Sequence, residues 1–530
     1  MIVTTEAAVR QYDQAQAAEA AERAQWAAMQ AASRCTAHEV ARPPLAAAFC
    51  AGRWHAIDSV SAFDCVVSPC GHLADVPESM RLDWARAHVD VFDYIEAATA
   101  AGDQLALERG LKWYLCLHDV LLRGPRRSSR GANRRSRGPS LCEQEIAGRF
   151  DRWRAGKRDL LVQSWLDDRE RCRRQQRDRQ ARRDRGEEAQ YQQDLDHQMA
   201  RVLDLIRDGE LSKAMSLLHS AGMADLTDGV LQQLAAKHPI RARSIPQTLP
   251  PSQHPVHPIR VELTEIFRGL HRRAGTGPSG RRNEYLRALI GHFGDATADR
   301  VMPAYDSFAS KLANVEFPEW FYAAISIGGL HPLVKQPLTP EQEAAGEDPD
   351  VRPIACGETD LRAIWRAVTS AFTEAAVEIL APQQLAVGVH GGLSIMVHGI
   401  RINLELHPDF VVVKVDIRNA YNATSRADML RRVSQHPRLA GLVPFLHACM
   451  ASGSDLVVGP SGERLFPGAD RADSSEGTAQ GLPPSSMIFS LLIQPELEAL
   501  DCELAAHGGC ARAAMDDVYA VGPPRVVFDA

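Results

Sequence analysis

The chain has 530 residues, of which 45% are hydrophobic and 24% charged, a composition typical of a folded protein with about two to four domains. Its net charge of −7 argues against a uniformly basic nucleic-acid-binding protein, and no apolar run is long enough to span a membrane. The N-terminus lacks the pattern of a secretory signal, and the 11 cysteines include no CxxC pair, which favours reduced thiols over disulfides. We therefore expect an intracellular protein of the nucleus or cytoplasm with no membrane partner.

Residues 1–122 are predicted to be a helical N-terminal region that begins with a stretch rich in Ala, Gln and Glu. Within it, Cys65, Cys70 and His72 resemble half of a zinc site. One loop does not supply the usual set of four ligands and no second pair follows, so buried or incidental cysteines are the favoured interpretation.

Two arginine-rich segments lie in the next region, residues 123–200. Residues 123–138 contain seven arginines and no acid, and residues 169–185 contain nine arginines against three acids. Such blocks are typical of segments that bind polyanions, and equally of a solvated linker followed by an exposed helix. We predict that the first block is disordered and that one long polar helix extends from about Ser140 to Leu195.

A short helical segment is predicted over residues 201–238, because apolar residues recur there at helical spacing. The face in question consists of Leu211, Ala214, Met215 and Leu218. The proline-rich stretch 239–258 is predicted to be a linker, and we place the main domain boundary there.

The sequence GTGPSG at residues 275–280 matches the GxGxxG pattern of dinucleotide-binding proteins. That motif requires a preceding strand, whereas the residues before it have a helical pattern. Pro278 and Ser279 instead indicate a turn, with Ser279 as N-cap of the next helix.

The sequence VVVKVD at residues 411–416 places one aspartate at the end of a run of valines. β-Branched residues predict a buried strand covered on both faces. A carboxylate at its end is costly unless a cation meets it. Asp416 is therefore a candidate ligand of a cation.

A second acidic pair, Asp516 and Asp517, has small and apolar residues on both sides, which predicts a β-hairpin with the acids at its tip. Such a pair in a turn is commonly just solvated. Together with Asp416, however, it provides carboxylates from more than one strand. Two Mg²⁺ ions about 4 Å apart need such an arrangement for phosphoryl transfer. We predict that the three acids bind Mg²⁺ or Mn²⁺ together with water and substrate phosphate.

Between the two acidic sites lies the sequence EGTAQGLPPSSMIFSLL. Gly477, Gln480 and Gly481 would let the backbone approach a ligand closely, before an apolar helix that anchors the loop. The alternative is an ordinary glycine turn before a buried helix.

Taken in this order, these stretches resemble the reverse transcriptase domain of non-LTR retrotransposons, over roughly residues 255–530. VVVKVDIRNAYNATSR resembles the first palm motif, GTAQGLPPSSMIF the template-and-nucleotide motif, and AMDDV the Tyr-x-Asp-Asp motif. Upstream stretches are similar to the finger segments of the family: GPSGRRNEYL, LHPLVK, VRPIACGETDLRAI and QLAVGVHGG.

The resemblance implies an α+β fold, with the fingers and palm of a right-hand polymerase over residues 259–530. It implies RNA-directed DNA polymerase activity of retroelement origin, with dNTPs and a primed RNA or DNA template as partners. The three acids would hold the metals, Lys335 and Arg352 would bind the triphosphate, and Gln480 and Gly481 would line the nucleotide pocket. Tyr421 would lie under the sugar, where its ring excludes a 2′-hydroxyl.

Three residues depart from the family pattern. Ala514 stands for the motif tyrosine, Leu482 for the usual aspartate, and Pro484 for the usual leucine. The chain also ends soon after Asp517, where the rest of the palm and the thumb would follow, so we expect little processive activity. Two alternatives stay open: a non-catalytic nucleic-acid-binding remnant of a retroelement, and an RNA-dependent RNA polymerase, against which Tyr421 argues.

Overall fold

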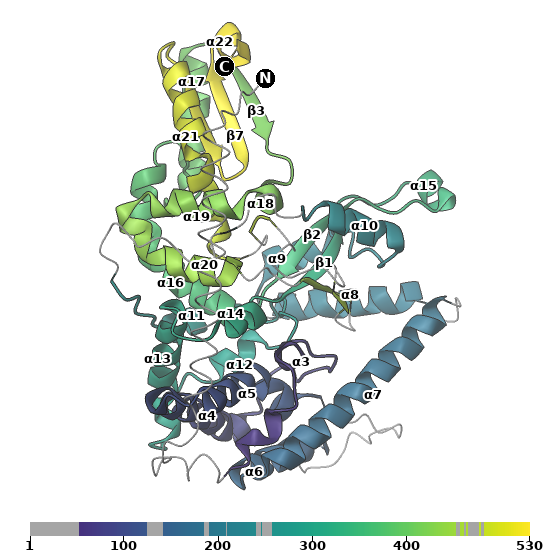
Figure 1. Ribbon diagram of the computed structural model, residues 1–530. Coiled ribbons are helices and arrows are strands. Elements are labelled where there is room, and N and C mark those ends of the chain that lie inside the picture. The colour runs from purple at the N-terminus through teal and green to yellow at the C-terminus, as the bar shows by residue number, and fades with distance from the viewer. Residues whose placement is uncertain are drawn as a thin grey trace, which may run out of the picture. The chain divides into compact units, whose positions relative to one another are not determined.

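The protein is described by a computed structural model in which residues from Gly52 onward form one compact unit (Figure 1). The residues described are 52–124, 141–184, 190–207, 209–239, 245, 257–451, 456–459, 463–464, 476–478 and 482–529. Within them the fold is α+β: helices predominate, and seven strands form two small sheets. None of the described helices is long and apolar enough to cross a membrane. The helices expected before Trp54, most of the first arginine-rich block and most of the proline-rich stretch lie outside the described residues.

Tryptophan side chains form the core of the N-terminal helical region. Trp84, Trp113 and Trp165 are fully buried, and Trp84 donates its indole N–H to Tyr285 O at 3.0 Å, which ties this region to a later segment. The helices are η1 (Trp54–Ile57), α3 (Ala62–Val66), η2 (Glu78–Met80), α4 (Arg81–Ala101), α5 (Gln104–Leu122), α6 (Leu141–Arg154) and α7 (Arg158–Asp184).

The prediction of one long polar helix from Ser140 to Leu195 is wrong, because α6 and α7 are separate and a third helix begins at Gln190. Gly156, in a left-handed conformation with φ 67°, separates the first two. Arginines at the start of both basic blocks are buried. Arg123 donates to Asp168 Oδ2 at 2.8 Å, and Arg169 pairs with Asp64 and Asp119. These two guanidiniums therefore serve the fold and are not presented to a polyanion.

The segment before the proline-rich stretch forms α8 (Gln190–Arg207), α9 (Leu211–Leu218) and α10 (Asp228–Ala236). The predicted apolar face of α9 is helical, but only Ala214 of it is buried; the other three residues are exposed. α10 packs through Val230 and Leu234 onto a four-stranded sheet of order β2-β1-β4-β5. Its strands are β1 (Gly328–Val334), β2 (Val351–Cys356), β4 (Leu456–Val458) and β5 (Glu463–Arg464).

Helices connect this sheet to the N-terminal region and to the second sheet. α13 packs against α4, where the rings of Phe92 and Tyr305 lie 5.0 Å apart. The connecting elements are α11 (Thr264–Arg268), α12 (Asn283–Arg287), η3 (Ala298–Arg300), α13 (Val301–Ala313), α14 (Glu319–Ile325), α15 (Pro340–Ala345), α16 (Thr359–Leu380), α17 (Gly392–Leu406), α18 (Ala420–Ala423), α19 (Arg426–Ser434), η4 (Pro437–Leu442) and α20 (Val443–Ala451).

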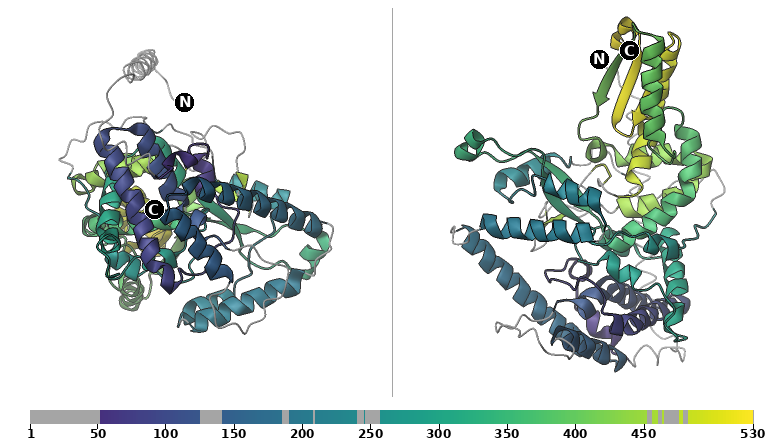
Figure 2. Two further views of the ribbon diagram at one scale, coloured as in Figure 1. Left: turned by 90° about the horizontal axis from the view of Figure 1, so that it is seen from below. Right: turned by 180° about the vertical axis from the view of Figure 1, so that it is seen from behind.

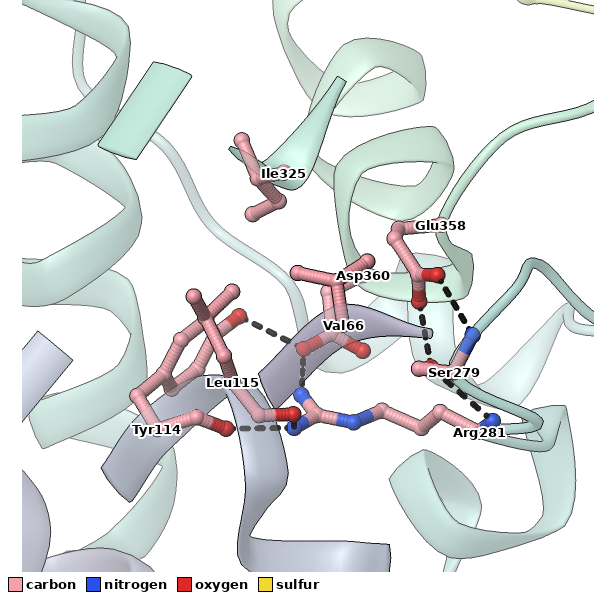
Figure 3. A pocket seen from close by; sticks show the side chains of 8 residues that line it. All are labelled: Val66, Tyr114, Leu115, Ser279, Arg281, Ile325, Glu358 and Asp360. Atoms are coloured by element: carbon pink, nitrogen blue, oxygen red, sulfur yellow. Dashed lines mark hydrogen bonds and ion pairs between the residues drawn. The ribbon is translucent and has the colours of Figure 1, made fainter. Parts of the chain in front are cut away.

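A buried ion cluster joins α5 to the start of α16 (Figure 3). Arg281 forms an ion pair with Asp360, and both residues are only 3% exposed. Tyr114 donates its hydroxyl to Asp360 Oδ2 at 2.6 Å, and its carbonyl accepts from Arg281 at 2.6 Å. Beside them, Glu358 accepts from the N–H and the hydroxyl of Ser279 at 2.9 and 2.5 Å. The cavity that these residues line is about 10 Å³, far too small for a nucleotide.

Among the described residues, the GTGPSG segment is preceded by α11 and by no strand, as predicted, and it supplies Ser279 to this cluster. The expected N-cap role of Ser279 is wrong, however. α12 begins at Asn283 with Arg282 as its N-cap, and the Ser279 hydroxyl is already committed to Glu358.

The second sheet has three strands in the order β3-β7-β6. They are β3 (Val411–Asp416), β6 (Cys510–Ala514) and β7 (Asp517–Gly522), and the neighbouring helices are α21 (Ser485–Ala505) and α22 (Pro524–Asp529). One face packs on α21 through a cluster of Leu497, Leu504, Ala511, Ala513 and Ala520. Figures 1 and 2 show β3 and β7 side by side, with α21 against the sheet.

The prediction that residues 411–416 form a strand is confirmed, but the prediction that it is buried on both faces is wrong. β3 is an edge strand, and Val412 and Val415 are 37% and 48% exposed. Valine runs indicate β propensity, and they do not by themselves determine what covers the strand.

Candidate metal and nucleotide site

Two strands and one turn bring the predicted acids into one sheet. β3 and β7 are antiparallel, with Asp416 directly opposite Asp517. β6 and β7 form a hairpin in which Ala514 faces Asp517, so Met515 and Asp516 make the turn. The predicted hairpin with acids at its tip is confirmed. Opposite residues of antiparallel strands have Cβ atoms about 5 Å apart, so Asp416 and Asp517 leave the same face of the sheet as neighbours.

Lys414 is the cation beside these acids. Its Nζ lies 2.9 Å from Asp517 Oδ1, and it shares a strand face with Asp416, two residues away. The hydrogen bond to Asp517 raises the pKa of Lys414, and the charge of Asp416 contributes. Asp517 thus has a cationic partner within the chain, whereas neither Asp416 nor Asp516 has an ion pair among the described residues.

Gln384 holds the hairpin tip. Its side-chain amide donates to Met515 O and accepts from Met515 N, both at 3.0 Å. Gln384 is fully buried, and Met515 has a left-handed φ of 61°, which is unfavourable for a residue with a side chain. The adjacent backbone pairs with β6, where Ala513 N donates to Gln383 O at 2.7 Å. Residues before α17 therefore fix the conformation from which Asp516 projects.

Tyr421 lies near the same tip. Its ring packs 5.1 Å from that of Phe489 in α21. Partial burial raises the pKa of the Tyr421 hydroxyl, a hydrogen bond with Ser486 opposes this, and the negative charge of Asp516 raises it further. Tyr421 is therefore near enough to Asp516 for that charge to raise its pKa, and Phe489 gives the ring a packing partner.

The start of the predicted nucleotide loop docks on the turn after β3. Gly477 N donates to Thr424 O at 2.7 Å, and Arg426 donates to Gly477 O at 2.8 Å. Gly477 has a φ of 76°, and a Cβ there would collide with the backbone of Tyr421 and Asn422. Gly477 thus approaches the chain's own backbone closely, whereas its approach to a ligand stays a prediction. Gln480 and Gly481 lie outside the described residues.

The two predicted phosphate-binding residues lie on the hairpin of β1 and β2. Lys335 follows β1 directly, and its Nζ is 2.7 Å from Asp350 Oδ2. Arg352 lies opposite Leu333 in β2, is exposed, and has no ion pair among the described residues. Arg352 is therefore available to a ligand, while Lys335 is engaged with an acid of its own hairpin.

Lys237 connects this hairpin to the turn that follows Asp416. Its Nζ lies 2.6 Å from Asp350 Oδ1, and its carbonyl accepts from the Asn419 side chain at 2.9 Å. The hydrogen bond from Lys237, followed by that from Lys335, lowers the pKa of Asp350 to about 2. One lysine at the end of α10 thus contacts both the predicted phosphate-binding hairpin and the loop that begins at the predicted metal site.

The donor set suits a hard divalent cation in kind, since Asp416, Asp516 and Asp517 offer only oxygen atoms. Among the described residues, no three His, Cys, Asp or Glu side chains already converge as metal ligands. The same finding applies to Cys65, Cys70 and His72. Binding at the three aspartates therefore requires their side chains to rotate and Lys414 to release Asp517.

Sequence reasoning missed three residues of this site. Lys414 was detectable, because a charge two residues before Asp416 on a strand must share its face. Gln384 and Lys237 carry no such local signal, since they act on backbone far away in the chain.

No protein-family model matches this sequence, and no curated protein matches it.

Proposed function

We propose that residues 259–530 form the fingers and palm of a polymerase that catalyses template-directed nucleotidyl transfer. The observation that carries the proposal is the register of β3 and β7, which sets Asp416 opposite Asp517 with Asp516 in the adjoining turn. Like charges directly opposite each other destabilise a sheet, and Lys414 pairs with Asp517 but not with Asp416, so Asp416 is costly unless a further cation joins it.

In the proposed reaction, a primer 3′-hydroxyl attacks the α-phosphate of a dNTP, and pyrophosphate leaves. Asp416, Asp516 and Asp517 would hold two Mg²⁺ ions, which supply charge stabilisation to the attacking and leaving oxygens. Arg352 would grip phosphate oxygens bidentately, and Lys335 would add a point charge once released from Asp350. Tyr421, beside Asp516, would exclude a 2′-hydroxyl. Gln480 and Gly481 would line the nucleotide pocket.

Calorimetric titration with Mn²⁺ tests the metal site directly. Wild type is expected to bind Mn²⁺, and Asp416→Asn is expected to weaken binding at least about tenfold, because it removes a charged ligand. Asp409→Asn serves as control, since Asp409 is exposed shortly before β3. Equal heats from wild type and Asp416→Asn would contradict the proposal.

Primer extension on a homopolymer RNA template then tests the reaction and its sugar choice. We expect short, Mn²⁺-dependent products that Asp416→Asn abolishes. Tyr421→Val should relax discrimination between dNTP and rNTP about tenfold, the scale of one small group admitted to a pocket, whereas Tyr421→Phe should not. Unchanged discrimination in Tyr421→Val would instead assign the ring to packing against Phe489 and favour an RNA polymerase.

One observation favours a second candidate, a nucleic-acid-binding protein without turnover. Lys414 already forms an ion pair with Asp517. A lysine in that position could take the place of a metal ion. This alternative predicts that wild type binds a homopolymer RNA in a salt-dependent manner. It also predicts no Mn²⁺ heat and no primer extension, an outcome that separates it from the polymerase.

A further inference from the structure

Two cysteines far apart in the sequence lie face to face where α7 meets the loop after α3. The thiols of Cys70 and Cys172 share a hydrogen bond, and both residues are partly exposed. Cys70 belongs to the loop that follows Val67, and Cys172 lies in the middle of α7. This pair has no part in the site described above.

One face of α7 holds the pair in place. Arg169, Cys172, Arg173 and Gln176 recur at helical spacing and all face the same segment. Arg169 donates to Val67 O at 2.9 Å, Arg173 to Asp64 Oδ1 at 2.8 Å, and Gln176 to Pro69 O at 3.0 Å. Cys172 is thus bracketed by hydrogen bonds to residues on the N-terminal side of Cys70.

The loop that carries Cys70 is also fixed from its other sides. Ser68 N donates to Pro278 O at 3.0 Å, Cys70 N donates to Ser68 Oγ at 3.1 Å, and Gly124 N donates to Gly71 O at 2.6 Å. Because both backbones are anchored around the two thiols, their approach is a built feature of the fold. A disulfide forms readily only between cysteines already held close together.

We propose that Cys70 and Cys172 form a reversible disulfide on exposure to a peroxide, and that this bond fastens α7 to the loop after α3. The Cys172 thiolate attacks a peroxide oxygen, which gives a sulfenic acid and releases water. The Cys70 sulfur then attacks the sulfenic sulfur; the S–O bond breaks, and the sulfenic hydroxyl leaves with the Cys70 proton as a second water. Two thiols and one hydrogen peroxide therefore yield one disulfide and two waters, and a thiol reductant such as glutathione reverses the bond.

The order of the two steps follows from the environments of the thiols. The hydrogen bond from Cys70, helped by the positive charge of Arg171, lowers the pKa of Cys172 from 9.0 to about 7. The same hydrogen bond and burial raise the pKa of Cys70. Cys172 is therefore the attacking thiolate, and Cys70 is the resolving cysteine, which gives up its proton as the sulfenic hydroxyl leaves as water.

A second cysteine pair provides an internal control. The thiols of Cys65 and Cys116 also share a hydrogen bond, but these residues are 2% and 0% exposed. A reagent in water reaches the first pair and not the second. Exposure therefore predicts that Cys70 and Cys172 oxidise while Cys65 and Cys116 keep their thiols.

The test treats the full chain with hydrogen peroxide, alkylates the remaining thiols and maps the digest by mass spectrometry without reduction. The expected result is one peptide pair joined through Cys70 and Cys172, which dithiothreitol separates. Oxidation of other cysteines with both of these alkylated would overturn the proposal, and so would disulfides of either one to a different residue.

Single serine variants keep the test sharp, because serine conserves the size of the side chain. In Cys70→Ser, the sulfenic acid of Cys172 has no resolving thiol and should be trapped by dimedone. Cys502→Ser, an exposed cysteine of α21, should leave the cross-link intact. Oxidation should raise the Tm of wild type by at least about 2 °C, because the bond closes a long loop of the unfolded chain. No rise in wild type, or an equal rise in Cys172→Ser, would show that the bond does not fasten α7.

Discussion

The protein contains two groups of carboxylates in opposite circumstances. Around Arg281, the carboxylate of Asp360 is buried, and its ion pair and hydrogen bond come from residues distant in the sequence. At the sheet of β3 and β7, three aspartates lie on two paired strands and the adjoining turn, all at least partly exposed, with Lys414 as the only ion-pair partner among the described residues.

This difference separates charges that the fold requires from charges that it does not. Burying a carboxylate without a partner costs several kcal/mol, so the first group must be matched for the chain to fold. The second group is at least partly exposed and faces no such requirement, and the repulsion between Asp416 and Asp517 weakens the sheet that carries them. A bound cation would offset this repulsion, which is the reason that we propose one for this group.

Breaking the buried group should have the largest effect on stability. Arg281→Met leaves Asp360 as a buried charge without its cation. We expect this to lower the free energy of unfolding by about 3–5 kcal/mol. Guanidinium denaturation followed by circular dichroism measures it. Arg260→Ala is the control, because that side chain is 86% exposed and pairs with the exposed Glu262.

The exposed acids should respond in the opposite direction. In the absence of metal, Asp416→Asn should leave the free energy of unfolding unchanged or raise it slightly, by no more than about 0.5 kcal/mol, because it relieves a like-charge pair. A destabilisation of Asp416→Asn as large as that of Arg281→Met would remove the distinction between the two groups.

Disrupting the tip of the β6–β7 hairpin should have an intermediate effect on the free energy of unfolding. Gln384→Ala removes the amide that pairs with both backbone groups of Met515, which we expect to cost about 1–3 kcal/mol. Hydrogen exchange at the Met515 amide should accelerate, since its acceptor is lost. Gln435→Ala, at an exposed site, should change neither quantity. Unchanged exchange in Gln384→Ala would mean that the turn holds itself.

The sequence predicts local features of this site better than its long-range ones. The hairpin at Asp516 and Asp517 follows from small apolar residues on both sides of a polar turn, and the strand at residues 411–416 follows from its valines. Whether that strand is central or at an edge depends on which strands pair with it, and a run of valines is compatible with either.

The pairing of the buried charges could not be predicted from local sequence either, because it also depends on segments that are distant in the chain. Arg281 lies beside an ordinary turn motif, and Asp360 lies at a helix start, where an acid is favourable in any case. Nothing within a few residues of either indicates a partner about eighty residues away or the contribution of Tyr114. Gly156, by contrast, was a local signal, and it marks the break between α6 and α7 that our helix prediction overlooked.

Glu358, in the buried group, should impose a pH dependence. Burial raises its carboxyl pKa above the ordinary 4.5, although hydrogen bonds from Ser279 oppose this. Its contribution to stability is therefore present below pH 4.5 and is lost as the pH rises through its pKa in the folded protein. Glu358→Gln removes this dependence, because an amide pairs with Ser279 without a charge.

The measurement is the denaturation midpoint of wild type and Glu358→Gln at a series of pH values from 4 to 7. We expect Glu358→Gln to gain stability relative to wild type as the pH rises. Asp350 does not interfere, because its pKa is lowered to about 2 and its contribution changes only below about pH 4. A constant difference between the two proteins would show that Glu358 keeps one protonation state throughout.

The smallest effect concerns the exposed group and depends on the proposed metal site. Lys414 lies 2.9 Å from Asp517 and competes with any divalent cation for that carboxylate. Lys414→Gln should therefore tighten Mn²⁺ binding about two- to fivefold, the scale of one exposed ion pair, and the gain should shrink at high salt. Lys335→Gln is the matched control, because Lys335 is also partly exposed and paired with an aspartate, but on the other sheet. Weaker Mn²⁺ binding in Lys414→Gln would mean that the lysine supports the site, and an equal gain in Lys335→Gln would mean that only the overall charge matters. A gain confined to Lys414→Gln would identify the ammonium as the occupant that the metal must displace.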